Sequence, residues 1–96
     1  MFAHLTIVQI QPESIEEANQ FYKNIHIPEL KSHKGFQKAY MLINREELKG
    51  ISLTFWDGEE DCLARMNTEE YIQRHANLPE GATPPVREGY EIIAES

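Results

Sequence analysis

Four short runs rich in β-branched and aromatic residues are spaced along this chain, and each favours a β-strand. They cover residues 3–10, 36–44, 51–56 and 86–94. Between the first two runs, from Ile15 to Ile25, apolar residues recur at the three- and four-residue spacing of one helix face. We expect Pro28 to end or kink this helix, and a polar turn to follow over residues 29–34.

The helix ends carry their own signals. Ser14, with Glu17 three residues later, forms a capping-box pattern at the start of the first helix. A second helix follows the third strand, and its acidic first turn suits the helix dipole. Thr68 looks like a fresh N-cap, so a separate helical segment is expected over residues 69–76. Residues 77–85 contain three prolines and a glycine, which predicts an irregular connection before the last strand.

The resulting order, β-α-β-β-α-β, predicts an α+β fold of the ferredoxin-like class. In this arrangement a four-stranded antiparallel sheet carries its helices on one face. We expect the whole chain, residues 1–96, to form this single domain.

Both faces of the predicted sheet are apolar. In the first strand Leu5 and Ile7 point one way, while Val8 and Ile10 point the other way. An antiparallel sheet with one face in water alternates apolar with polar residues, and two helices can cover only one face. The second face would be an exposed apolar patch, which marks an interface. We therefore expect a homodimer, paired through this face into an α/β barrel.

Charge and cysteine content narrow the classes of partner. The net charge is −7, and such a surface repels nucleic-acid phosphates and anionic membranes, so neither is expected as a partner. The sole cysteine, Cys62, cannot form an internal disulfide, and no apolar run approaches the length of a membrane span. We expect a cytoplasmic protein whose partners are a second copy and a small aromatic or apolar ligand.

The sequence lacks the motifs that mark several classes of enzyme. The chain has no phosphate-binding loop, nucleophile elbow or Cys–His motif, which argues against nucleotide-dependent and nucleophilic enzymes. His26 and His33 match no zinc signature.

Six residues are candidates for a site, and each has a plainer alternative. His75 and His4 are the candidate catalytic bases, because a neutral imidazole accepts a proton near neutral pH. Their plainer alternatives are a cap of the last helix carbonyls for His75 and an ordinary half-exposed strand residue for His4. The candidate ligand-binding side chains offer flat faces or hydrogen bonds to an aromatic ligand, but their alternatives are core packing for the aromatic residues and surface ion pairing for the arginine. They are Trp56, Tyr40, Tyr71 and Arg65.

The residues Gly35-Phe36, then Tyr40, then the run SLTFW at 52–56 before an acidic helix start resemble the antibiotic biosynthesis monooxygenase family. This resemblance implies paired ferredoxin-like domains that form a barrel. The family includes cofactor-independent oxygenases of aromatic polyketides, heme-degrading enzymes and members with no demonstrated reaction.

The resemblance to the heme-degrading branch is partial. His75 falls where that branch carries its axial heme ligand, so it would bind the iron if heme binds. An Asn expected on the first strand is replaced by His4 and Thr6, and a Trp expected in the second helix is replaced by Arg65. The resemblance thus implies a monooxygenase that acts with dioxygen on a small aromatic or heme-like ligand, with no cofactor or with heme. The alternative is a non-catalytic ligand-binding or regulatory dimer.

Overall fold

The computed structural model describes residues 1–76 and 84–96 of the chain, without the side chains of residues 75 and 76. Its elements are, in order, β1 (Phe2–Gln9), the 3₁₀ turn η1 (Pro12–Ser14), α1 (Ile15–Phe21), the π-helical segment η2 (Tyr22–His26), α2 (Ile27–Lys31), β2 (Phe36–Asn44), β3 (Lys49–Trp56), α3 (Glu59–Met66), α4 (Glu69–Ala76) and β4 (Val86–Glu91).

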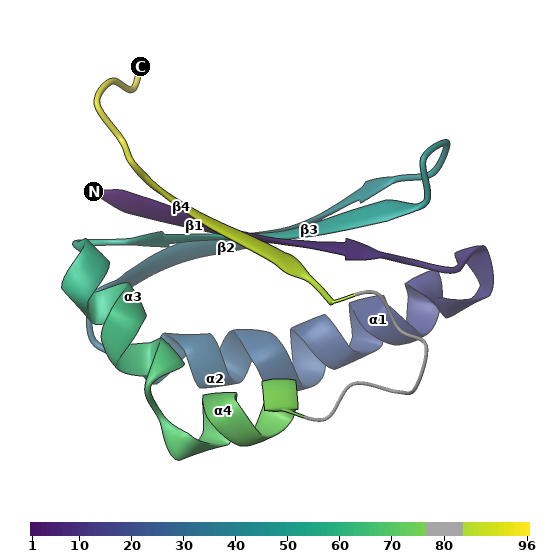
Figure 1. Cartoon of the computed structure of the whole chain (residues 1–96), viewed down its shortest axis with the longest axis horizontal. Coiled ribbons are helices and arrows are strands. Elements are labelled where there is room, and N and C mark those ends of the chain that lie inside the picture. Colours follow the sequence, from purple (N-terminus) through teal and green to yellow (C-terminus); the bar gives the residue numbers. More distant parts are fainter. Residues whose placement is uncertain (77–83) are drawn as a thin grey trace.

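The four strands form one antiparallel sheet in the order β2-β3-β1-β4. All the helices lie on one side of this sheet, below it in Figure 1, and no helix of the described chain covers the other side. Strand β3 lies between β1 and β2, which is the split βαβ topology. The predicted ferredoxin-like α+β fold is confirmed, although β4 ends at Glu91 rather than at residue 94.

The densest part of the core lies at one end of the sheet. Trp56 and Leu30 are fully buried, and Trp56 pairs across the strands with Phe2. The rings of Phe36 and Trp56 pack edge to face, with their centroids 5.5 Å apart. Cys62 completes this buried cluster from α3. Because the large side chains gather at this end, space remains between sheet and helices farther along β1.

The capping box predicted for Ser14 is wrong. Ser14 has helical torsion angles (φ −95°, ψ −4°) and makes no side-chain cap hydrogen bond. The 3₁₀ turn η1 already holds it in a helical conformation, whereas a capping residue needs an extended one to reach the amides of the first turn.

Pro28 does not end the first helix. The helical path continues to Lys31, and the five-residue π-helical segment η2 precedes the proline. The amide of Ile27 donates to the carbonyl of Tyr22, five residues earlier. Pro28 then falls in the first turn of α2, a position that tolerates its missing amide hydrogen. The polar turn expected from residue 29 therefore begins only after Lys31.

The N-cap predicted at Thr68 is confirmed, since its Oγ1 accepts a hydrogen bond from the amide of Tyr71 at 3.2 Å. Of the irregular connection predicted over residues 77–85, residues 77–83 lie outside the described part. None of the described helices is long and apolar enough to cross a membrane. The cytoplasmic location stays a prediction.

The face of the sheet opposite the helices is apolar, as the strand pattern predicts. It presents alternate residues of each strand, and four of its large side chains are about half exposed: Tyr40 (45%), Leu42 (43%), Val86 (55%) and Tyr90 (49%). We call this surface, with Leu5, Ile7, Ile51, Leu53 and Phe55 between them, the open face.

Candidate functional site

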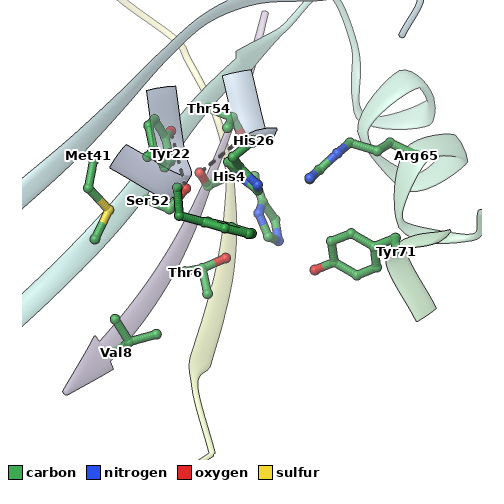
Figure 2. A pocket seen from close by; sticks show the side chains of 11 residues that line it. His4, Thr6, Val8, Tyr22, His26, Met41, Ser52, Thr54, Arg65 and Tyr71 are labelled. Carbon is green, nitrogen blue, oxygen red and sulfur yellow. Dashed lines mark hydrogen bonds between the residues drawn. The ribbon is translucent and has the colours of Figure 1, made fainter. Parts of the chain in front are cut away.

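A pocket of about 150 Å³ lies between the sheet and the helices. Figure 2 shows its side chains converging from the strands and from the helical layer. The strand residues that line it are His4, Thr6, Val8, Met41, Ser52 and Thr54. The helical residues are Phe21, Tyr22, His26, Arg65 and Tyr71.

Strand alternation sets the floor of the pocket. His4 and Thr6 of β1 stand opposite Thr54 and Ser52 of β3, and side chains two residues apart share a face. The Thr54 hydroxyl accepts a hydrogen bond from the indole of Trp56 at 2.9 Å and donates one to the His4 carbonyl at 3.4 Å. The floor therefore carries fixed hydroxyl groups beside the imidazole of His4.

The π-helical segment supplies one wall. Tyr22 is the first residue of η2 and His26 is the last, and their rings lie 4.9 Å apart. The Tyr22 hydroxyl donates to the carbonyl of Tyr40 at 3.3 Å and lies 3.4 Å from the hydroxyl of Ser52. Burial raises the pKa of Tyr22, so this phenol stays protonated at neutral pH.

Arg65 reaches the pocket from α3 and is only 5% exposed. Its Nε and Nη2 donate to the two carboxylate oxygens of Glu29, at 3.0 and 2.7 Å, a bidentate geometry that fixes the guanidinium plane. The guanidinium carbon lies 5.0 Å from the centre of the Tyr71 ring. The hydroxyl of Tyr71 accepts a hydrogen bond from the Nε of Arg87 at 3.1 Å.

Glu29 is the common acceptor beneath this wall. Besides Arg65 it contacts the Nε2 of His33 at 2.6 Å and the Nη1 of Arg74 at 3.1 Å. Burial alone would raise the pKa of Glu29, but the hydrogen bond and charge of Arg65, together with His33, lower it to about 2. The carboxylate is therefore ionised throughout the neutral range.

The surroundings of His4 favour the neutral form of its imidazole. Burial lowers its pKa from 6.5, and the positive charges of Arg87 and Arg65 lower it further. Within the described part of the chain, no hydrogen bond holds either ring nitrogen. A neutral, half-buried imidazole that faces a pocket can accept a proton from a bound ligand.

Three of the six residues predicted from the sequence meet at this pocket: His4, Arg65 and Tyr71. Trp56 is completely buried in the core, so its ring packs there and cannot stack on a ligand in the pocket. Tyr40 projects from the open face, away from the pocket. The side chain of His75 lies outside the described part of α4, so its predicted roles stay predictions.

Sequence reasoning missed several polar groups of the site. Ser52 and Thr54 occupy alternate positions of an otherwise apolar strand, and that alternation is a signal of a polar lining that we did not use. Tyr22 and His26 are four residues apart on one helix, which would have suggested a shared face. Nothing local marks Glu29 as the partner of Arg65, which lies 36 residues away.

The described residues offer no ready binding site for a metal ion. Among the residues that the structure describes, no group of three or more His, Cys, Asp and Glu side chains is arranged to hold a metal ion.

Comparisons with known proteins identify the fold. No family model matches the sequence, and no curated protein matches it. Solved structures do match over almost the whole chain. Rv0793 of Mycobacterium tuberculosis superposes with a TM-score of 0.75 at 10% identity, covering 99% of this chain and 97% of its own.

Two other matching structures are those of a heme-degrader and a monooxygenase. MhuD of M. tuberculosis, a heme-degrader solved with two hemes in its active site, has a TM-score of 0.74 at 18% identity and covers 100% of this chain and 99% of its own. A monooxygenase, ActVA-Orf6 of Streptomyces coelicolor, solved with nanaomycin D, has a TM-score of 0.73 at 14% identity over 99% and 92% of the two chains. A putative antibiotic biosynthesis monooxygenase of Bacillus cereus also matches, with a TM-score of 0.72 at 14% identity over 99% and 93% of the two chains. The chain thus has the fold of these proteins, as its sequence resemblance implied.

Proposed function

We propose that this protein is a cofactor-independent monooxygenase that oxidises a small phenol or quinol with dioxygen and works as a homodimer. The observation that carries the proposal is the half-buried imidazole of His4, which faces the pocket between sheet and helices without a hydrogen-bond partner among the described residues, and whose pKa is lowered by burial. The fold shared with ActVA-Orf6 and with MhuD supports the reaction class.

The size of the pocket favours a small substrate over a heme. The pocket has a volume of about 150 Å³. Sites for drug-sized ligands are larger, about 300–1,000 Å³. The volume of this pocket suits a single aromatic ring better than a whole porphyrin.

The reaction needs only a base and a dry site. His4 takes the proton of the phenol, and the electron-rich anion passes electrons to dioxygen. The oxygen–oxygen bond and one ring carbon–hydrogen bond break. One oxygen atom bonds to that ring carbon as a carbonyl oxygen, which gives a quinone. The other oxygen leaves as water with the two hydrogens that the substrate gave up, one of them returned by His4. All electrons come from the substrate.

The apolar walls support this step. Val8, Phe21 and Met41 line the pocket beside the polar floor, and exclusion of water strengthens electrostatic interactions inside a site. A phenolate formed there would be less shielded and a stronger reductant.

The proposed homodimer rests on the open face. Its half-exposed apolar side chains form a patch that a monomer rarely leaves in water. A second copy placed on it would bury both patches and leave the pocket, on the other side of the sheet, accessible.

Oxygen uptake tests the proposed function. We expect purified protein, without added cofactor and with a metal chelator present, to consume oxygen in the presence of one-ring and two-ring phenols or quinols. His4→Gln should lower kcat/KM by about a hundredfold or more, since a positioned base contributes roughly 10²–10⁴-fold. An oxygen electrode, with quinone formation followed by absorbance, provides the measurement.

Two results would redirect the proposal. Tight binding of these phenols without oxygen uptake would make the protein a binding module. A 1:1 heme complex whose Soret band is lost in His75→Ala, with turnover that depends on heme, would replace the cofactor-free version by the heme-dependent one.

A further inference from the structure

Arg65 is a charged side chain built into the wall of the pocket. It is 95% buried, since only 5% of it is exposed, and both hydrogen bonds that fix it go to Glu29, at 3.0 and 2.7 Å. A buried guanidinium needs such a partner to offset the loss of water. Its orientation is therefore set before any ligand arrives.

One nitrogen of this guanidinium, Nη1, makes no hydrogen bond within the described chain. Nε and Nη2 donate to Glu29, while Nη1 donates to no residue of the described chain. No fully buried side-chain nitrogen or oxygen among those residues is left without a partner, so Nη1 keeps some contact with solvent. Arg65 lines the pocket, and Figure 2 shows its guanidinium directed toward His4.

The surroundings of Arg65 carry an excess of positive charge. Glu29 pairs with Arg65 directly and also contacts His33 and Arg74. Arg74 pairs in turn with the more exposed Glu70, and Arg87, like Arg65, lies over the ring of Tyr71. Arg65 and Arg74 share the single buried carboxylate of Glu29, and Arg87 is held by the hydroxyl of Tyr71. A chain with a net charge of −7 thus places further cationic groups close behind Arg65, the one arginine among the described residues that line the pocket, and low-dielectric walls focus such a field.

We infer that the free edge of Arg65 is an anion subsite, so that the ligand of this pocket is an aromatic anion whose carboxylate or phenolate oxygen binds Nη1. Glu29 is a positioning residue that holds the guanidinium for this contact. The inference rests on the proposed function, because it assigns the same pocket to the substrate.

The anion subsite would also contribute to the proposed oxidation of the phenol. An anionic oxygen held by Arg65 anchors the ring beneath His4, and a charge-assisted hydrogen bond is stronger than a neutral one. When the anion is the phenolate itself, Arg65 stabilises the species that reacts with dioxygen. When it is a separate carboxylate, Arg65 fixes the orientation of the ring toward His4.

Matched ligands test the subsite. The probes are 4-hydroxybenzoate and 4-hydroxybenzamide, which share the phenol and differ in charge, measured by isothermal titration calorimetry. We expect the wild-type protein to bind the benzoate about tenfold or more tightly, the range of one hydrogen bond to a charged group. For the phenolate source, 4-nitrophenol should bind with a larger fraction in its yellow anionic form, read by absorbance.

Three variants separate the subsite from general damage. Arg65→Gln should abolish the preference for the benzoate. The double variant Glu29→Gln with Arg65→Gln should abolish it as well, and its two amides can still bond to each other without a buried charge. Arg74→Gln is the matched control, because Arg74 also bonds to Glu29 but does not line the pocket, and it should keep the preference.

The outcomes distinguish this inference from the function on which it rests. Equal binding of benzoate and benzamide by the wild-type protein, or a preference that survives Arg65→Gln, overturns the anion subsite and leaves the proposed monooxygenase intact. Failure of every aromatic probe to bind overturns the pocket as a substrate site, and the subsite with it.

Discussion

His4 is the single residue on which the proposed reaction depends most. It faces the pocket from β1, and burial together with the charges of Arg87 and Arg65 lowers its pKa below 6.5. A base with such a pKa is already unprotonated at neutral pH. Neighbouring cations that favour a neutral imidazole also favour an anionic substrate, so both effects act in the same direction.

The pH dependence of turnover tests the protonation state of His4. Since protonated His4 cannot act as a base, kcat/KM should be constant above its pKa and fall about tenfold per unit as the pH drops below it. The midpoint should lie below 6.5, because the pKa is lowered. Oxygen uptake measured with a substrate that does not titrate between about pH 5 and pH 8 gives the profile.

Glu29 and His26 provide the controls for the pH dependence of kcat/KM. Glu29, with its pKa of about 2, stays ionised across the whole window and contributes no limb. His26→Gln should keep the acid limb whatever it does to the plateau, whereas the residual rate of His4→Gln should lack it. A midpoint above 6.5 would contradict the assignment.

At the scale of elements, the first helix places two side chains of the site through a departure from regular geometry. The π-helical segment η2 begins at Tyr22 and ends at His26, and both line the pocket. Periodicity predicted a helix here, because apolar spacing reports which face is buried. It did not predict the π segment, because a segment of five residues is too short for apolar spacing to distinguish a π turn from an α turn.

The turn before β2 gives a second element-scale prediction. Gly35 has φ +83°, and a Cβ there would collide with the Asp61 carboxylate. Its carbonyl accepts the amide of Asp57 at 2.8 Å, which joins the start of β2 to the end of β3. Gly35→Ser should lower the free energy of unfolding by about 1–3 kcal/mol, the usual range for a residue forced into such a conformation, measured by urea denaturation.

Gly58→Ser is the matched control for that substitution. Gly58 is extended (φ −151°) at the N-cap of α3, and the nearest neighbour of an added Cβ is the flexible Glu60 at 3.6 Å. Serine suits an N-cap, so this variant should stay within about 0.5 kcal/mol of the parent. Equal losses in the two variants would show that backbone conformation at Gly35 is not the cause.

For the whole molecule, the fold was more predictable than the site. The order of strands and helices follows from periodicities that each segment carries within itself, and one antiparallel sheet accommodates them. The site depends on pairs from distant segments, such as Arg65 of α3 and Glu29 of α2, whose meeting depends on how the helices pack. Alternation along β1 places His4 on the same side as Thr6 and Val8 but does not say which side lines a pocket, so the sequence left His4 open between a base and a plain strand residue. Trp56 was assigned to ligand binding, with core packing as its alternative, and the core buries it completely.

The open face makes the last prediction, which concerns assembly. Leu42 is 43% exposed on the open face, and Leu63 is 47% exposed on α3 in the helical layer. A lysine at either position costs the monomer little, because both side chains already reach water, but on the open face it would place a charge inside the proposed dimer interface. Leu42→Lys should therefore sediment as a monomer at low micromolar concentration, while Leu63→Lys and the wild-type protein sediment as dimers. A wild-type protein that sediments as a monomer at that concentration would contradict the dimer, and dissociation caused equally by Leu63→Lys would move the interface to the helical layer.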